Sequence, residues 1–250
     1  MKEKSLEVLM SDPIRVLVNG ARGKMGKQTC IAVDAANDLL LVAQLNRGDD
    51  VATALEKHKI DVAVDFTVPN VVFDHTKTYI DANVHPVIGT TGLDEKQIKE
   101  LQVMAREKKL GGIIAPNFSI GAILMMHFAK IANRFLSHAE IIEMHHEKKL
   151  DAPSGTALKT VSHMQTAQLA CEHNQFASRG LIKNNIPIHS VRLPGYVAHQ
   201  QVILSGEKEL LTLRHDSIDR SCFMPGVVLA CRQVQQLDEL VFGLENLLDL

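Results

Sequence analysis

The sequence feature that most constrains the fold is a glycine-rich turn directly after a short β-branched run. Residues 14–18 read Ile-Arg-Val-Leu-Val, and Gly20, Gly23 and Gly26 follow, before a helical stretch at residues 27–36. Strand, glycine-rich turn and helix form the context in which a backbone approaches a pyrophosphate at a helix N-terminus. The spacing departs from the usual Gly-x-Gly-x-x-Gly, because Ala21 stands where that pattern has a glycine. A tight turn without a ligand is the alternative.

Apolar strand-like runs and helical stretches then alternate through the first half of the chain. Strands are predicted at residues 39–45, 61–67, 85–92 and 112–118, and helices at 70–82 and 94–108. Such a series predicts a parallel sheet with right-handed crossovers, in which ligands lie beyond the carboxyl ends of the strands. The residues at those ends are Gly20, Asn46, Thr67, Thr90 and Asn117. The last three could instead be helix caps or turn formers.

The second half predicts a mixed sheet with helices. Helices are expected at residues 119–135 and 157–169, and strands at 139–144 and 188–192. Residues 171–186 look polar and irregular, residues 199–204 and 210–215 form a hairpin, and residues 227–250 look helical and apolar. We therefore predict an α/β chain in two domains. Residues 1–118 and 223–250 form a Rossmann-type dinucleotide-binding domain, and residues 119–222 form an α+β substrate-binding and oligomerisation domain.

The composition excludes several classes of partner. The 250-residue chain has a formal net charge of -2, so it lacks the basic footprint of a nucleic-acid-binding protein. No apolar run approaches the roughly 20 residues of a membrane span, and the first twelve residues lack an apolar signal core. The cysteines Cys30, Cys171, Cys222 and Cys231 show no CxxC spacing, so we expect free thiols and a cytoplasmic location.

A polar cluster follows the strand predicted at residues 139–144. It begins with His145 and His146, and Lys149 comes shortly after. Adjacent side chains on a strand point to opposite faces, so the two histidines are not expected to act on one atom. No His-x-x-x-His pair or cysteine cluster completes a metal site, so we expect no metal. His145 could donate a proton to an anionic intermediate near neutral pH, although histidines without a function are the alternative from the spacing alone.

The start of the next helix predicts an anion receptor. Asp151 or Ser154 can cap this helix, and Pro153 suits its first turn. Ser154, Gly155 and Thr156 then present hydroxyl and backbone N–H groups at a positive helix end. Together with the glycine turn, this arrangement predicts a small, anionic, reducible substrate beside a nicotinamide ring.

The chain resembles the dihydrodipicolinate reductase family, also called 4-hydroxy-tetrahydrodipicolinate reductase, of bacterial lysine and diaminopimelate synthesis. Five stretches carry the resemblance in the family's order: residues 18–26, 64–67, 89–92, 115–119 and 143–157. It covers about residues 14–250. It implies NAD(P)H-dependent reduction of a cyclic unsaturated dicarboxylate to tetrahydrodipicolinate, by a homotetramer joined through the sheet of the second domain.

The resemblance also implies a role for each matching residue. His145 would be the general acid/base and Lys149 the second proton donor. The residues that would hold the substrate or lie near it are His146, Ser154, Gly155, Thr156, Thr91 and Arg220. The residues that would line the binding site of NADH or NADPH are Gly20, Ala21, Arg22, Gly23, Lys24, Met25, Asn46, Arg47, Gly89, Thr90, Thr91, Ala115, Pro116, Asn117 and Phe118.

Two residues bear on the choice of cofactor. The family commonly has an acidic residue where this chain has Asn46, and an acidic residue there binds the ribose 2′-OH of NADH. Arg47 could meet the 2′-phosphate of NADPH, or it could be a solvated surface charge. We expect NADPH to be used as well as NADH or better.

Two other functions stay open on the sequence alone. A non-catalytic NAD(P)-binding sensor would use the same glycines and strand ends, but it would not need a proton donor beside an anion receptor. Another two-domain dehydrogenase, acting on an amino-acid aldehyde, is the third possibility.

Overall fold

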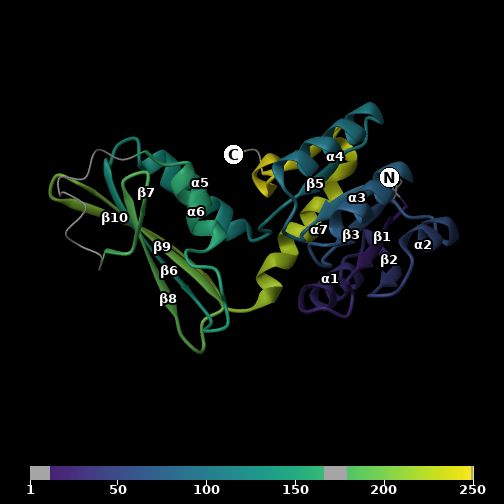
Figure 1. Ribbon diagram of the computed structural model, residues 1–250, viewed down its shortest axis with the longest axis horizontal. Coiled ribbons are helices and arrows are strands. Elements are labelled where there is room, and N and C mark those ends of the chain that lie inside the picture. The colour runs from purple at the N-terminus through teal and green to yellow at the C-terminus, as the bar shows by residue number, and fades with distance from the viewer. Residues whose placement is uncertain (1–11, 166–178, 249) are drawn as a thin grey trace, which may run out of the picture. The chain divides into compact units, whose positions relative to one another are not determined.

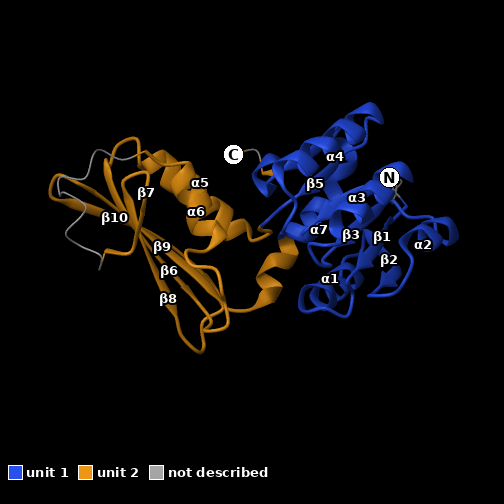
Figure 2. Ribbon diagram, viewed as in Figure 1, with its two compact units in different colours: residues 1–116, 226–247 blue, residues 117–225, 248–250 orange. Residues whose placement is uncertain are grey.

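The computed structural model describes residues 12–165, 179–248 and 250, and the chain divides into two compact units (Figures 1 and 2). Residues 1–116 and 226–247 form the first unit, and residues 117–225 and 248–250 form the second. Several expectations lie outside the described residues: the N-terminal segment, residues 166–169 of the helix expected at 157–169, Cys171, and the first half of the stretch 171–186. Two expectations are wrong within the described residues, because that helix ends at Ser162 and residues 181–183 form a strand. Cys30, Cys222 and Cys231 are free.

The first unit contains a parallel sheet, which confirms the Rossmann-type prediction. Within the described residues it has six strands in the order β11-β5-β4-β3-β1-β2, and all neighbours are parallel. The strands are β1 (Ile14–Asn19), β2 (Leu39–Leu45), β3 (Val62–Asp65), β4 (His85–Ile88), β5 (Gly112–Ile114) and β11 (Leu240–Phe242). From β1 the sheet grows first to β2 and then, on the other side, to β3. The ends of β1 and β3 therefore form the switch point where such sheets bind ligands.

Helices connect these strands. They are α1 (Lys24–Asp34), α2 (Val51–Lys57), α3 (Val72–Asp81), α4 (Glu95–Glu107) and, near the C-terminus, α7 (Met224–Gln233) and the 3₁₀ turn η4 (Val234–Gln236). α1 begins three residues earlier than expected, so Gly26 lies in its first turn. A Cβ on Gly26 would come 2.1 Å from the carbonyl oxygen of Gly20, so only glycine lets the helix pack this closely. The short helix α2, capped by Asp50, was not predicted.

The prediction of a wholly helical C-terminal stretch is wrong. After α7 and η4 the chain forms β11, which pairs in parallel with β5 and places Leu240 opposite Gly112. The 3₁₀ turn η5 (Leu244–Leu247) follows. A three-residue apolar run has no readable period, and the free edge of β5 gives it backbone partners. The tail thus completes the first sheet.

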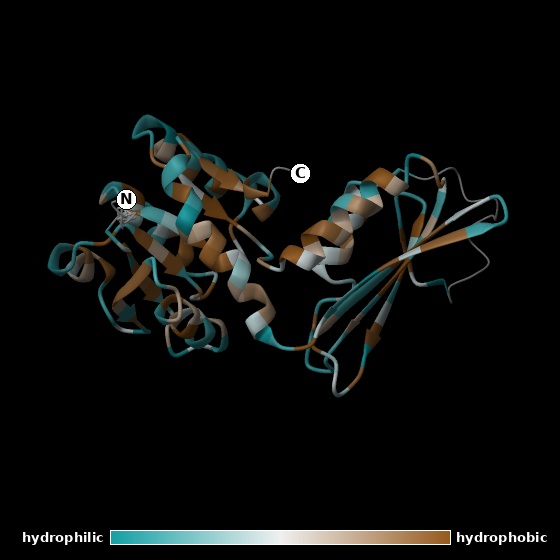
Figure 3. Ribbon diagram, turned by 180° about the vertical axis from the view of Figure 1, so that it is seen from behind, coloured by the Kyte–Doolittle hydropathy of each residue, from teal (hydrophilic) through white to brown (hydrophobic). Residues whose placement is uncertain are grey.

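The strands of the first sheet are apolar along most of their length (Figure 3). All four residues of β3 are buried, and so are the last four of β1. Burial on both faces is usual for parallel strands that helices cover. Charged or polar residues at these positions must therefore find partners inside the protein.

The second unit contains the predicted mixed sheet. Its order is β10-β9-β6-β8-β7, and within this sheet only β6 and β8 pair in parallel among the described strands. The elements are α5 (Ile120–Ala132), β6 (His138–His145), α6 (Gly155–Ser162), β7 (Leu181–Lys183), β8 (Ile186–Arg192), β9 (Ala198–Gly206), β10 (Glu209–Ser217) and η3 (Arg220–Phe223). β9 and β10 form the predicted hairpin. No helix in the described residues is long and apolar enough to cross a membrane.

Candidate active site

The glycine-rich turn lies at the switch point of the first sheet. Gly20 has a φ of +81°, and a Cβ there would come 2.5 Å from the carbonyl oxygen of Phe66, just beyond β3. The backbone N–H groups of Gly20 and Ala21 donate to the carbonyl oxygen of Leu45, at the end of β2. The turn is therefore fixed against two neighbouring strand ends, which a residue other than glycine would push apart.

The start of α1 fits a bound pyrophosphate. Its N-cap residue, Gly23, offers no side chain to cap the helix, and the first turn carries no acidic residue. Arg22 and Lys24 beside it are exposed, and Met25 is partly buried. A helix N-terminus without a side-chain cap, flanked by two cations, favours an anion.

The loop after β2 contacts the same turn. The side-chain oxygen of Asn46 accepts a hydrogen bond of 2.7 Å from the backbone N–H of Arg22. The backbone N–H of Asn46 donates to Asp49 at 2.8 Å, and the carboxylate of Asp49 is exposed beside it. Arg47 is exposed.

The predicted strand-end threonines meet a buried carboxylate that was not predicted as a site residue. One oxygen of Asp65, at the end of β3, accepts from the backbone N–H of Thr67 (2.9 Å), its hydroxyl (2.6 Å) and the hydroxyl of Thr90 (2.8 Å). The hydroxyl proton of Thr90 is therefore engaged inside the protein. Thr91, next to it, is exposed and can reach a ligand.

The second oxygen of Asp65 also accepts three hydrogen bonds. It accepts from the Tyr79 hydroxyl (3.0 Å), the Asn19 amide (3.3 Å) and the His75 ring (3.2 Å). Burial alone would raise the pKa of Asp65, but hydrogen bonds from His75 and the two threonines outweigh it and lower the pKa. Burial and the charge of Asp65 raise the pKa of Tyr79 well above 10. An ionised Asp65 thus joins the ends of β1, β3 and β4.

The remaining predicted cofactor residues differ in exposure. Gly89 is partly buried and Pro116 is exposed, whereas the side chain of Ala115 is buried. Asn117 and Phe118 belong to the second unit, and Phe118 is buried there.

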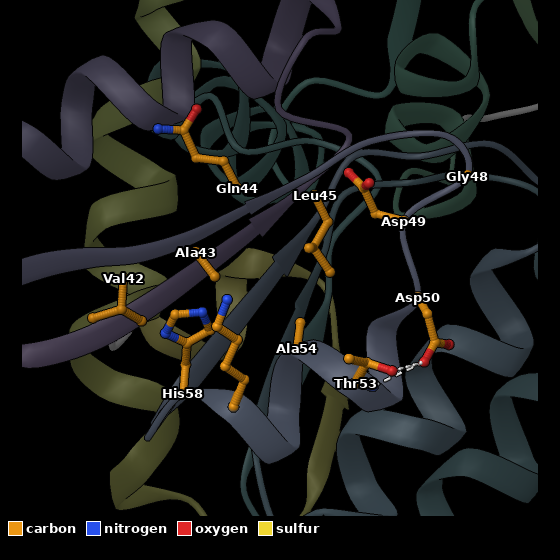
Figure 4. A pocket seen from close by; sticks show the side chains of 11 residues that line it. Val42, Ala43, Gln44, Leu45, Gly48, Asp49, Asp50, Thr53, Ala54 and His58 are labelled. Atoms are coloured by element: carbon orange, nitrogen blue, oxygen red, sulfur yellow. Dashed lines mark hydrogen bonds between the residues drawn. The ribbon is translucent and has the colours of Figure 1, made fainter.

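A surface pocket of about 550 Å³ lies on the first unit, beside the end of β2 (Figure 4). It is lined by residues of β2, α2 and the loop between them: Val42, Ala43, Gln44, Leu45, Gly48, Asp49, Asp50, Thr53, Ala54, Lys57 and His58. None of the predicted site residues lines it, but two lining residues contact them: Leu45 accepts from the N–H groups of Gly20 and Ala21, and Asp49 accepts from the N–H of Asn46. The pocket therefore adjoins the glycine turn.

In the second unit, His145 is the last residue of β6 and is held by a buried acid. Its Nδ1 lies 2.5 Å from Oε2 of Glu143, two residues earlier on the same face of the strand. Arg192 of β8 donates two hydrogen bonds to Glu143, of 2.9 and 2.8 Å. Burial alone would raise the pKa of Glu143, but hydrogen bonds from His145, Arg192 and Ser190 lower it to about 2.

The turn after β6 carries the predicted lysine. The ammonium group of Lys149 lies 2.8 Å from a carboxylate oxygen of Asp151, and this contact lowers the pKa of Asp151. His146 comes just after the strand, and its carbonyl oxygen accepts from the backbone N–H of Lys149. Asp151 thus pairs with the lysine and does not cap the helix.

The start of α6 is capped by Ser154, one of the two predicted caps. Its hydroxyl oxygen accepts from the N–H of Ala157, and its own N–H donates to Glu143. Pro153 precedes the cap, so the prediction that it lies in the first turn is wrong. Gly155 is exposed, and a Cβ there would meet no protein atom within 4 Å.

Asn117 contacts the start of this helix, whereas Arg220 is not hydrogen-bonded to it in the part of the chain that the structure describes. The side-chain amide of Asn117 donates to the hydroxyl of Thr156 at 3.4 Å, so these two predicted residues meet within the second unit. Arg220 begins η3, beyond β10, and no hydrogen bond among the described residues joins it to His145 or Ser154.

Three members of these sites, Asp65, Glu143 and Arg192, were not predicted from the sequence. A signal was available, because each lies on a strand among apolar residues, and a buried charge needs a partner. Among the described residues, no group of three or more His, Cys, Asp or Glu side chains is arranged to hold a metal ion.

Comparison with known proteins decides the family. The model of the dihydrodipicolinate reductase N-terminus matches residues 14–118, and the model of its C-terminus matches residues 121–248. The chain belongs to the dihydrodipicolinate reductase family. Members of this family are NAD(P)H-dependent oxidoreductases, so the chain is an enzyme and NADH or NADPH is its cofactor.

Relatives match over nearly their whole length. The 4-hydroxy-tetrahydrodipicolinate reductase of Coxiella burnetii (strain RSA 493 / Nine Mile phase I) is 50% identical over 94% of this chain and 99% of its own. That of Legionella pneumophila (strain Lens) is 47% identical over the same shares. A dipicolinate-bound dihydrodipicolinate reductase from Paenisporosarcina sp. TG-14 has a TM-score of 0.85 at 42% identity, covering 94% of this chain and 99% of that one. A probable dehydrogenase from Thermotoga maritima, with a TM-score of 0.66 at 12% identity and coverage of 94% and 92%, shares the fold.

Proposed function

We propose that the chain reduces 4-hydroxy-tetrahydrodipicolinate to tetrahydrodipicolinate in diaminopimelate and lysine biosynthesis, with His145 as the general acid. The observation that carries this proposal is the pairing of His145 with a buried, ionised Glu143 that also binds the start of α6. A titratable ring is thus fixed beside a helix N-terminus suited to an anion. The family match over the whole fold supports the substrate.

The reaction needs one hydride and one proton, and it releases the 4-hydroxyl group as water. Bound NADH or NADPH supplies the hydride. Addition of a hydride to the unsaturated ring leaves an anion, which must take up a proton. His145 gives that proton from Nε2 when its ring is protonated on both nitrogens, because Nδ1–H is held by Glu143, and the ring is left as the neutral Nδ1–H form. General acid catalysis of this kind contributes about 10²–10⁴-fold.

The dicarboxylate is held by the turn after β6 and the start of α6. Lys149 supplies a positive charge, and its present partner Asp151 is largely exposed and can be exchanged for a substrate carboxylate. The exposed Gly155 and partly buried Thr156 supply N–H and hydroxyl groups, and His146, Ser154, Thr91 and Arg220 complete the proposed substrate set. The related Paenisporosarcina reductase binds dipicolinate, a dicarboxylate, which supports this class of substrate.

The cofactor is held by the first unit, in this proposal. The uncapped start of α1, with Arg22 and Lys24, binds the pyrophosphate. The neutral Asn46 and the cationic Arg47 next to it allow NADPH to be used as well as NADH or better, because a 2′-phosphate meets no carboxylate at residue 46.

The proposed assembly is a homotetramer joined through the sheet of the second unit. Ile142 of β6 and Ile203 of β9 lie on the strand face opposite Glu143 and are only partly buried, and Leu210 of β10 is 74% exposed. Such side chains favour contact with another copy. Light scattering after gel filtration should give four times the mass of one chain, and a monomer would contradict this. The free cysteines support a cytoplasmic location.

The test of function is the loss of the near-ultraviolet absorbance of NADH or NADPH when the substrate is made in place by its upstream synthase. Lys149→Ala should lower both kcat and substrate affinity, whereas Lys148→Ala, an exposed neighbour, should change neither. A chain that binds cofactor but never oxidises it with this substrate is a sensor or another dehydrogenase, and the proposal fails.

A further inference from the structure

The carboxylate of Glu143 is the common partner of three separate segments. Its Oε2 accepts from Nδ1 of His145 and from Nη1 of Arg192, and its Oε1 accepts from Nη2 of Arg192. The fourth bond, of 3.2 Å, comes from the backbone N–H of Ser154 to Oε1. The side chain of Ser190 also hydrogen-bonds to this carboxylate, so both oxygens of this fully buried group are occupied by donors of the protein.

This arrangement dictates which nitrogen of the ring carries a proton. An ionised carboxylate can only accept, so Nδ1 of His145 must be the donor. The neutral ring is then the Nδ1–H tautomer, with Nε2 left for a ligand. Arg192 fixes Glu143 in turn, because its guanidinium also donates to the carbonyl oxygens of Val191 (2.7 Å) and Asp151 (2.7 Å).

We propose that Glu143 is a positioning residue. It sets the tautomer and the orientation of His145, and it holds the ring at a fixed position relative to the start of α6. The inference rests on the proposed role of His145 as the acid. Glu143 touches neither substrate nor cofactor, and it acts through the histidine and through Ser154. Arg192 is the fixed counter-ion that keeps Glu143 ionised.

The test is Glu143→Gln, which preserves the shape of the side chain. An amide has one acceptor oxygen. Arg192 donates to both carboxylate oxygens, so either orientation leaves one of its nitrogens facing the NH₂ group. Ser154 decides for oxygen at the Oε1 position, because a backbone N–H can only donate whereas His145 can change its tautomer. The NH₂ group is then turned toward Nδ1 of His145, which has to accept and thus become the Nε2–H tautomer. Nitrogen-15 NMR of the histidine rings above their titration range reports this directly, and the signal absent from His145→Gln identifies the residue.

The expected result is an Nδ1–H tautomer in the unaltered enzyme and an Nε2–H tautomer in Glu143→Gln. We expect kcat to fall by between about 10-fold and 10⁴-fold, the range seen when a carboxylate partner of a histidine is altered. The KM for the dicarboxylate should change little, since the side chain of residue 143 does not contact the substrate and the start of α6 keeps its acceptor.

A matched control lies on the same strand. Glu140 of β6 points to the opposite face and also pairs with a histidine and an arginine, His189 (2.9 Å) and Arg179. Glu140→Gln makes the same chemical change with the same kinds of partner, away from His145. It should leave the His145 tautomer unchanged. It should also leave kcat unchanged in protein whose assembled mass equals that of the unaltered enzyme, a check that is needed because Glu140 shares its strand face with Ile142 and Ile203.

The outcomes separate this inference from the proposed function. An Nε2–H tautomer in the unaltered enzyme overturns the inference without any variant having to fold, and so does an unchanged tautomer in Glu143→Gln. A changed tautomer with an unchanged kcat overturns the assignment of His145 as the acid, and with it the catalytic part of the inference. A changed tautomer with a lowered kcat supports both.

Discussion

Replacement of Asp65 by Asn tests the idea that one buried charge holds the strand ends of the first unit together. The carboxylate accepts six hydrogen bonds, from Thr67 (two), Thr90, Tyr79, Asn19 and His75. An amide keeps one acceptor oxygen and turns an NH₂ group toward the donors around the other. Up to three donors therefore lose their partner.

The cost follows from the burial of Asp65, whose side chain is fully buried. Each buried donor left without a partner costs about 1–3 kcal/mol. Because up to three donors are affected and some of them can reorient, we expect Asp65→Asn to lower the free energy of unfolding of the first unit by about 3–5 kcal/mol.

Tyrosine fluorescence can measure this in the first unit alone. The chain has no tryptophan and two tyrosines, and Tyr79 lies in the first unit while Tyr196 lies in the second. Urea unfolding in a Tyr196→Phe background therefore reports on the first unit. Asp38→Asn is the control, because its pair with Arg232 is about half exposed and should contribute less than about 1 kcal/mol. An equal, small loss in both variants would refute the reasoning.

Three further predictions concern the pH dependence of stability, the space for substrate beside Gly155, and the choice between NADH and NADPH. Folding lowers the pKa of Glu143 from 4.5 to about 2, which contributes about 3 kcal/mol to stability at neutral pH. This contribution is present above pH 4.5 and is lost as the pH falls toward 2, so the urea midpoint should drop more in the unaltered protein than in Glu143→Gln. Equal drops in the two proteins would contradict this prediction. Gly155→Ala should fold normally but raise the KM for the dicarboxylate, whereas Gly26→Ala should destabilise the fold; an unchanged KM in the first variant would show that no ligand occupies that space. Asn46→Asp should raise the ratio of kcat/KM for NADH to that for NADPH by about tenfold or more, and Arg47→Ala should lower kcat/KM for NADPH alone; a strong NADH preference of the unaltered enzyme would contradict the assignment.

Much of the fold could be predicted because the apolar runs carry a clear period. Strands β3 and β5 are short apolar runs that are buried along their whole length, and helix α4 shows helical spacing of its apolar residues. The last strand, β11, was not predicted, because Leu240–Phe242 lies inside the apolar stretch 227–250, which was interpreted as helical throughout, and its pairing with β5 is made across a long stretch of chain. The same holds for α2, which has only seven residues.

The site could be predicted in part, because function is concentrated in residue types that stand out in a sequence. Histidines, glycines and a serine cap are visible as such, and His145 and Ser154 do lie in one network. The acid that joins them, Glu143, was not predicted from the sequence. Glu143 and Arg192 are far apart in sequence, and only the parallel pairing of β6 and β8 brings them together.

The most direct test of the central claim is the effect of His145→Gln on turnover at saturating dicarboxylate and cofactor. If His145 supplies the proton, kcat should fall by about 10²–10⁴-fold, while the KM values change far less. A kcat equal to that of the unaltered enzyme would contradict the claim that His145 is the acid.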